Sequence, residues 1–436
     1  MPSPAPEPLA PRPLSVWLVN PFDDIPGEGL PPLRYWTLAR VLAARGHDVI
    51  WWTATWSHRR KAIRSAPLGI RDDEGFAVRL VAVRPYDKNV SFARLGSHRD
   101  FGRTFERLAN ESISSGQLER PDIILASLPP LDSPEAVARL ARKLDATFVL
   151  DLMDVWPETF ERLVPGPAFL KRFIAPFLLG GMQKRREALV AAADAVSAAT
   201  RTYADSVLGS ARTDLPRHVC YVGAYPQEFP NPQRLMNHVP MPDGGETTPP
   251  EPAPLECVYA GTLEAGQDLD VLAGAARQLS AAGVKATIHV AGTGTLEASL
   301  RRLASAVGGS CRLEVHGLLP RQAYVKLLSR CDVGLVCVKP ESLVAVPYKA
   351  CDYAAAGLAL VNSLPGELQR LIDEHDAGVA YTAGDAGSLA RAITGFASDR
   401  TRLAACQQGA RRLTAAEFDR ERTYPRFADW LETVSE

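Results

Sequence analysis

The feature that most constrains the fold is a repeated alternation between short apolar runs and longer segments with helical periodicity. Residues 15–20 (SVWLVN) form the first apolar run, and a loop with two glycines and four prolines follows it. A helical pattern then ends at Gly46, and a second apolar run begins at His47. Runs of this kind predict parallel strands that are buried on both faces, and a glycine after the last helical turn is typical of a C-cap. The sequence therefore predicts a βαβ unit with a right-handed crossover.

The same alternation occurs in two series. Between them, residues 237–255 are rich in proline and glycine and show no periodicity, which predicts a linker. The fold class expected is α/β, with two doubly wound, Rossmann-like domains that face each other across a cleft. The predicted divisions are a disordered N-terminus at 1–14, a first domain at 15–236, the linker at 237–255, a second domain at 256–400 and C-terminal helices at 401–436 that cross back to the first domain. Ligands of open α/β sheets bind outside the carboxyl ends of the strands, so the cleft is the expected binding site.

Composition excludes several classes of protein. The 49 Lys and Arg residues nearly balance the 50 Asp and Glu residues, so a net charge of −1 provides no overall field for nucleic acid. No apolar run reaches the roughly 18 residues of a membrane-spanning helix, and the N-terminus lacks the pattern of a signal peptide. The seven cysteines are odd in number and form no CxxC pair, which argues against a disulfide framework and a cysteine zinc site. We expect a cytoplasmic protein without a metal or cofactor.

Two glycine-rich loops follow predicted strands. Gly27 and Gly29 lie in the first domain, and Gly292 and Gly294 lie in the second. Neither loop completes the GxGxxG pattern of dinucleotide-binding proteins, so a dehydrogenase is disfavoured. The first loop is equally consistent with a ligand-binding loop and with an ordinary turn between a strand and a helix.

The segment 347–368 carries the strongest chemical signal. Lys349 and Asp352 are three residues apart on a predicted helix and share a face. The lysine could neutralise a phosphate, and the carboxylate could accept hydrogen bonds from ribose hydroxyls. A solvent-exposed ion pair is the alternative. The turn that contains Gly366, Glu367 and Leu368 leads into another helix, whose first amides could face a diphosphate.

Two segments of the first domain suggest contacts with a sugar and with a membrane. Asp154 and Trp156 follow a predicted strand, where a carboxylate and an aromatic ring suit sugar binding; a helix cap and a packed tryptophan are the alternative. Asp151 and Asp154 are not expected to bind a metal. The helical stretch 168–193 mixes basic and apolar residues, as helices on anionic membranes do, although a packed core helix is equally consistent. Its candidate acceptor or membrane residues are Lys171, Arg172, Phe173, Phe177, Lys184 and Arg185.

From about residue 15 to its C-terminus the chain resembles the retaining family-4 glycosyltransferases of GT-B fold, and most closely their bacterial branch that builds surface polysaccharides and glycolipids. The segments that carry the resemblance include LVNPFDDIPGEG, LASLPPLDS, VLDLMDVWPETF, VYAGTLEAGQDLDVLAGAA, VAGTGTLEASLRRLA and PYKACDYAAAGLALVNSLPGEL. The resemblance implies transfer of a sugar from a nucleotide-diphosphate sugar, without a metal, to an acceptor that could be lipid-linked. The basic and apolar residues of 168–193 are the basis for expecting peripheral contact with the inner face of the membrane.

The resemblance further implies roles for individual residues. Asp352 corresponds to the carboxylate that binds the nucleotide ribose, and Asp154 lies near the position of a residue that touches the donor sugar. Lys349 and Asp154 are the expected catalytic residues. The expected donor-binding residues are Gly27, Gly29, Gly261, Thr262, Gly292, Lys349, Asp352, Gly366, Glu367 and Leu368.

The chain departs from the family pattern at two positions. Many members carry Arg and Lys after the first strand of the second domain, where this chain has residues 261–267 (GTLEAGQ). Many also carry Glu eight residues before the ribose carboxylate, where this chain has Val344. Lys349 is then the expected cation for the diphosphate. A sugar-nucleotide epimerase of similar build and a non-catalytic homologue that binds nucleotide sugars are the alternative functions.

Overall fold

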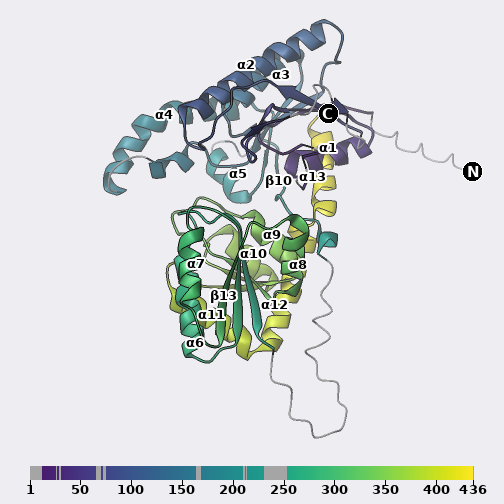
Figure 1. Cartoon of the computed structure of the whole chain (residues 1–436). Helices are drawn as coiled ribbons and strands as arrows, with labels where there is room; N and C mark the ends of the chain where they lie inside the picture. Colours follow the sequence, from purple (N-terminus) through teal and green to yellow (C-terminus); the bar gives the residue numbers. More distant parts are fainter. Residues whose placement is uncertain are drawn as a thin grey trace, which may run out of the picture. The chain divides into compact units, whose positions relative to one another are not determined.

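The computed structural model describes residues 12–25, 27–28, 31–64, 70–71, 75–163, 168–209, 212, 214–229 and 253–435. They form two compact units, one of residues up to 220 together with those from 424 onward, and one of residues 221–423. Both units are built on a mainly parallel sheet, with helices between most of the strands that follow one another in the chain (Figure 1). This confirms the predicted α/β class with two doubly wound units.

The first unit has the sheet order β10-β9-β8-β7-β1-β2-β6-β5, in which β5 alone runs antiparallel to its neighbour. Because β1 pairs with β2 on one side and with β7 on the other, the strand order reverses at β1. The strands are β1 (Ser15–Val19), β2 (Asp48–Ala54), β3 (Trp56–Ser57), β4 (Ala62–Ile63), β5 (Ile70–Arg71), β6 (Ala77–Val81), β7 (Ile123–Leu128), β8 (Thr147–Leu152), β9 (Ala195–Ala198) and β10 (Arg217–Val219), and the helices are α1 (Arg34–Ala44), α2 (Phe92–Ser114), α3 (Asp132–Leu144), η1 (Glu158–Leu163), α4 (Ala168–Ala192) and α5 (Arg201–Leu208).

Most elements of the first unit follow the predicted pattern. Every residue of β1 and β7 is buried, as expected for strands covered on both faces. Helix α1 ends where Gly46 adopts a φ of +87°, a conformation that favours glycine. Helix α2 was missed, because only two of its buried residues, Phe101 and Phe105, are large and apolar.

The second unit has the all-parallel order β13-β12-β11-β14-β15-β16. Because β11 pairs with β12 and β14, this sheet reverses its strand order between β11 and β14. The elements are η2 (Pro226–Glu228), β11 (Leu255–Ala260), α6 (Asp270–Ala281), β12 (Ala286–Ala291), α7 (Glu297–Ser305), β13 (Cys311–Gly317), α8 (Arg321–Arg330), β14 (Val333–Val336), α9 (Tyr348–Ala355), β15 (Ala359–Asn362), α10 (Glu367–His375), β16 (Gly378–Ala380), α11 (Ala386–Ser398), α12 (Arg400–Leu413) and η4 (Thr414–Phe418), with α13 (Arg420–Val434) spanning the division between the units.

The units divide elsewhere than at the predicted boundaries. The second unit begins at residue 221, because the residues that follow contact later parts of that unit. Ala224 forms a bridge with Asp419, and the Tyr221 hydroxyl donates to Glu367 at 2.5 Å. Helix α12 belongs to the second unit, whereas the last turns of α13 belong to the first. Most of the predicted linker and residues 1–11 lie outside the described residues, but Leu14, predicted as disordered, is buried.

The described helices include none that is both long enough and apolar enough to cross a membrane.

Candidate functional site

The strand reversal of the second unit brings Lys349 to the carboxyl end of β11. Helix α9 follows β14, and near its start the Lys349 ammonium donates to Gln267 Oε1 at 3.0 Å, in the loop after β11. The same ammonium lies 4.0 Å from the centre of the Tyr259 ring, at a cation–π distance. Lys349, the predicted cation for the diphosphate, therefore lies beside the loop of residues 261–267, which lacks the Arg and Lys of many family members.

The electrostatic state of Lys349 suits an anion receptor. Burial lowers the pKa of its ammonium to about 8. Among the described residues no carboxylate forms an ion pair with it, since its polar partner, Gln267, is neutral. A partly buried ammonium without a counter-ion gains from a bound phosphate both a charge partner and hydrogen bonds.

Asp352 has different neighbours from Lys349, although both belong to α9. Its Oδ2 accepts hydrogen bonds from Arg321 at 3.2 Å and from the Tyr324 hydroxyl at 3.0 Å, both in α8. Burial raises the pKa of the Asp352 carboxyl above its usual value, and Arg321 opposes that rise. Arg321 also pairs with Glu228. The alternative of a solvent-exposed pair between Lys349 and Asp352 is therefore wrong, and the sequence did not reveal Arg321 and Tyr324, because their helix lies 31 and 28 residues upstream.

The start of α10 offers backbone amides. Gly366 is its N-cap, with a φ of +87° and no side-chain cap, and Asn362 fixes the preceding turn through hydrogen bonds to both the amide and the carbonyl of Leu364. The side chains of Glu367 and Leu368 are buried. Any contact of these two residues with a ligand would therefore come from the backbone of the first helical turn.

Gly292 has a packing role that the sequence reasoning did not foresee. A Cβ at this position would lie 1.8 Å from the carbonyl oxygen of Gly261, whose own φ is +147°. At Gly294 a Cβ would lie 2.4 Å from the carbonyl oxygen of Leu263. The two glycines thus let the loop after β12 approach the loop after β11, which contains the predicted donor-binding residues Gly261 and Thr262.

The first unit holds a second group of polar and aromatic side chains, which come from the loops that follow its strands and from helix α2. Helix α2 contributes Arg94 and His98; the Arg94 guanidinium lies 5.5 Å from the Phe22 ring centre and 5.6 Å from that of Trp156. Arg94 Nε donates to His98 Nε2 at 3.3 Å, which leaves the proton of a neutral imidazole on Nδ1. That Nδ1 is buried and has no hydrogen-bond partner in the described structure. A buried donor of this kind calls for an acceptor.

Two further residues extend this group. His58 Nδ1 lies 2.6 Å from the Tyr86 hydroxyl, and Lys61 lies 4.8 Å from the centre of the Tyr86 ring. Burial and the charge of Arg94 lower the pKa values of both His58 and His98 to about 3. We call Phe22, His58, Lys61, Tyr86, Arg94, His98 and Trp156 the Arg94 cluster. These residues come from separate loops and from the missed helix α2, so the sequence does not show that they lie together.

Asp154 holds the turn that follows β8. Its Oδ1 accepts from the amide of Val155 at 2.8 Å and from the hydroxyl of Thr159 at 3.0 Å. Asp151 is wholly buried and forms a two-point ion pair with Arg34 at 2.8 and 2.9 Å. It also accepts from the hydroxyls of Tyr35 and Ser197. Asp151 therefore has a structural role, joining α1 to β8 and β9.

The predicted acceptor or membrane residues of α4 are only partly described. Phe177 is 88% exposed and Lys184 is exposed, so both are accessible to an acceptor or a membrane. Arg185 was expected to contact an acceptor or a membrane as a free cation. Its guanidinium is instead paired with Glu135 at 2.6 Å and with Asp132 at 3.1 Å. The side chains of Lys171, Arg172 and Phe173 lie outside the described residues, as does Gly29, whereas Gly27 occupies a turn with a φ of +83°.

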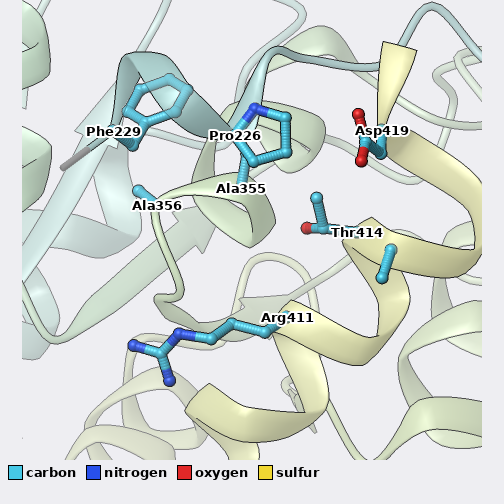
Figure 2. Close-up of a pocket in the computed structure, with 8 residues that line it drawn as sticks. Pro226, Phe229, Ala355, Ala356, Arg411, Thr414 and Asp419 are labelled. Atoms are coloured by element: carbon cyan, nitrogen blue, oxygen red, sulfur yellow. The ribbon is translucent and has the colours of Figure 1, made fainter. Parts of the chain in front are cut away.

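A hollow of about 280 Å³ in the second unit lies apart from the predicted residues. Figure 2 shows Phe229 and Pro226 on one side of it and residues of α12 and η4 on the other. Its lining consists of Pro226, Phe229, Ala355, Ala356, Arg411, Thr414, Ala415 and Asp419. None of these residues was predicted to bind the donor.

Comparisons with known proteins agree on one family. A family model described as "Glycosyl transferase 4-like domain" matches residues 33–223, and one described as "Glycosyl transferases group 1" matches residues 254–399. Together they cover more than half of the chain. A 185-residue stretch is 25% identical to WcaL of Salmonella typhimurium strain LT2, which carries a provisional name as a colanic acid biosynthesis glycosyltransferase. That match spans 42% of this chain and about half (46%) of the length of WcaL.

Solved structures resemble the chain over nearly its whole length. HepE from Anabaena, solved in complex with UDP, has a TM-score of 0.64 at 15% identity and covers 96% of this chain and 100% of its own. Sucrose-phosphate synthase from Thermosynechococcus elongatus has a TM-score of 0.67 at 14% identity, with 97% and 99% coverage. At these identities the likeness concerns the fold.

Proposed function

Because the chain belongs to the family-4 glycosyltransferases of GT-B fold, we propose that it moves a sugar from a nucleotide-diphosphate sugar to an acceptor hydroxyl with retention of configuration. We propose further that no metal takes part at the donor site, and that the product belongs to a surface polysaccharide or glycolipid. The similarity to WcaL supports the product class, and HepE, which has been solved with both UDP and UDP-glucose, supports the donor class.

The observation that carries this proposal is the position of the Lys349 ammonium at the end of β11. Many family members place their diphosphate cations in the loop after this strand, and this chain has none there. Lys349 reaches the same loop from α9, where it contacts Gln267 and the Tyr259 ring. The chain therefore retains a cation for the diphosphate, supplied from a different element.

Charge stabilisation is the main task of such a site. As the sugar departs, negative charge develops on the β-phosphate, and preorganised donors lower the barrier most when they face that charge. Lys349 and the first amides of α10 are the proposed donors. Asp352, held in place by Arg321 and Tyr324, is the proposed partner of the ribose hydroxyls. In a retaining front-face reaction the leaving phosphate takes the acceptor's proton, so the protein needs no dedicated base.

The Arg94 cluster is the proposed acceptor-binding group of the first unit. It combines the cations Arg94 and Lys61, neither of which forms a carboxylate ion pair within the described residues, with aromatic rings on which a sugar can stack. This composition favours an acceptor that carries a phosphate or diphosphate, as lipid-linked sugars do. The exposed Phe177 and Leu178 of α4 suit contact with the membrane that would hold such a lipid.

A turnover assay tests the proposal. The purified chain is incubated with a panel of nucleotide-diphosphate sugars, with and without EDTA, and with either an extract of bacterial lipid-linked oligosaccharides or buffer. The proposal predicts acceptor-dependent release of one nucleoside diphosphate that EDTA does not abolish. A changed sugar on the intact nucleotide would favour the epimerase alternative. Binding without turnover for every acceptor would favour the non-catalytic homologue.

A paired substitution tests the acceptor group. Arg94→Met should raise KM for an anionic acceptor by about 10–100-fold, which is the loss expected for a charge-assisted hydrogen bond, and should leave KM for the donor unchanged. Arg103→Met, at an exposed position on the same helix, is the matched control. An equal effect of the two substitutions, or a donor effect as large as the acceptor effect, would contradict the assignment.

A further inference from the structure

A group of histidines and carboxylates lies on the sheet of the second unit, apart from the residues assigned to the donor. It comprises Glu256 on β11, His289 on β12, and Glu314 and His316 on β13. The strand register places His289 opposite Glu314. The register shifts by one residue at His316, whose ring lies beside the His289 ring with 5.1 Å between their centres. Four chemically active side chains from three adjacent strands therefore share one face of the sheet.

Three atoms of this group converge on one point. His289 Nδ1 lies 3.0 Å from His316 Nε2 and 3.4 Å from Glu314 Oε2, and the latter two atoms are 4.0 Å apart. Metal–ligand bonds of about 2.1 Å in tetrahedral geometry put ligand atoms about 3.4 Å apart. The three separations lie around that value, and two imidazoles with one carboxylate are a donor set that suits zinc and related divalent ions.

Glu256 fixes which nitrogen of His289 faces this point. The Glu256 carboxylate lies 2.9 Å from His289 Nε2, so it accepts the proton of that nitrogen and leaves Nδ1 with a lone pair. A carboxylate that holds the remote nitrogen of a metal-bound histidine is a recurrent feature of zinc sites. Without a cation, the Nδ1 lone pair would accept the Nε2 proton of His316 at 3.0 Å, with the Glu314 carboxylate 3.4 Å away.

Access and local charge are compatible with a cation. The side chain of His289 is 5% exposed, whereas those of His316 and Glu314 are 24% and 42% exposed, which leaves an open side for entry and for a water ligand. Two carboxylates supply negative charge. Arg301, a cation that acts on His316, is paired with Glu297 at 2.8 Å.

We propose that His289, His316 and Glu314 bind one divalent transition-metal ion of the zinc class, with Glu256 orienting His289. The ion would fasten the edge strand β13 to β12. Because β13 leads directly into α8, which carries Arg321 and Tyr324, the ion would also steady the element that holds Asp352. This site is separate from the proposed donor chemistry and does not depend on it.

Zinc binding by the full chain tests the proposal. After treatment with EDTA and desalting, the chain is titrated with Zn²⁺ against a chromogenic chelator, and its thermal midpoint is measured with and without Zn²⁺. We expect one ion per chain and a rise in the midpoint. We also expect tetrahedral visible absorption bands when Co²⁺ replaces Zn²⁺. The seven cysteines are all buried and should not compete.

Variants separate the site from adventitious binding. His316→Ala and Glu314→Gln, both at partly exposed positions, should weaken zinc binding at least tenfold. Glu256→Gln should weaken it by about tenfold, the lower end of the effect of losing such an orienting group. His375→Ala, in α10, should change nothing. The proposal is overturned if the wild-type chain takes up no zinc, which would leave a hydrogen-bonded relay from Glu256 through His289 to His316, or if His316→Ala and Glu314→Gln bind as the wild type does.

Discussion

The affinity for the nucleotide sugar should fall as the pH rises through about 8. The reason is the Lys349 ammonium, whose pKa burial lowers to about 8. A bound diphosphate favours the charged ammonium and raises its pKa, so binding above pH 8 must take up a proton. If only the protonated lysine binds the diphosphate, about nine-tenths of the chains are competent at pH 7 and about one-tenth at pH 9. The dissociation constant should therefore increase about tenfold between these two values.

Calorimetric titration measures this effect directly. The ligand is the nucleotide sugar that stabilises the chain most, because a diphosphate esterified at both ends does not itself titrate in this range. Runs in two buffers with different ionisation enthalpies report proton uptake, which should approach one at pH 9. Lys349→Gln should bind more weakly and show no slope. Lys326→Gln, at an exposed position on α8, should keep the wild-type slope. A wild-type affinity that is constant from pH 7 to 9, or a slope that survives in Lys349→Gln, would refute the reasoning.

Four further substitutions have expected outcomes. Asp151→Ala strands the buried Arg34 guanidinium and should cost about 3–5 kcal/mol in urea unfolding; a loss below about 1 kcal/mol would mean that the pair contributes little. Gly366→Ala meets no atom within 4 Å and should cost only the strain of its backbone conformation (φ +87°, ψ −132°), about 1–3 kcal/mol. Gly292→Ala should cost more because its Cβ would overlap a carbonyl oxygen, and equal losses in thermal unfolding would contradict this difference. Asp352→Asn should reduce the preference for a ribonucleotide over its 2′-deoxy analogue in competition binding, and an unchanged preference would remove Asp352 from the ribose site.

Stability should respond to Lys349 in the opposite direction from binding. The pKa of this lysine is lower in the folded chain than the ordinary value of 10.5, so the unfolded chain holds the proton more tightly. The burial of the charged form therefore opposes folding below pH 8, and that cost is relieved as the pH rises from about 8 to 10.5. A residue that destabilises the free protein near neutrality and gains a partner from the ligand is typical of a binding site.

Most strands and helices could be predicted from the sequence, because each has its own local pattern of apolar residues. Every residue of β1 and β7 is buried, so the burial of both strand faces can be read from consecutive apolar residues. Helix α2 was not readable, since its buried face includes Ser97, Gly102 and Ser112. The unit boundary at residue 221 was also missed, because it depends on contacts with residues near 419 that no local pattern reveals.

The candidate site was readable only in part, and for the same reason. Lys349 and Asp352 stand in a segment whose spacing and family resemblance single them out. Their partners, Tyr259 and Gln267 for the lysine and Arg321 and Tyr324 for the carboxylate, come from other strands and helices. The Arg94 cluster and the His289 group are likewise assembled by the fold from residues that are distant in the sequence.

Ligand-dependent thermal stability tests the central claim most directly, namely that Lys349 makes the second unit a metal-free binding site for a nucleotide-diphosphate sugar. The wild-type chain and Lys349→Met are heated with a panel of nucleotide sugars in the presence and absence of EDTA. A ligand at about 100 times its dissociation constant should add roughly 2.7 kcal/mol to the free energy of unfolding. We predict that one nucleotide class stabilises the wild type equally with and without EDTA, and that Lys349→Met loses this stabilisation. Stabilisation that Lys349→Met retains in full, or that EDTA removes from both the wild type and His316→Ala, would contradict the account.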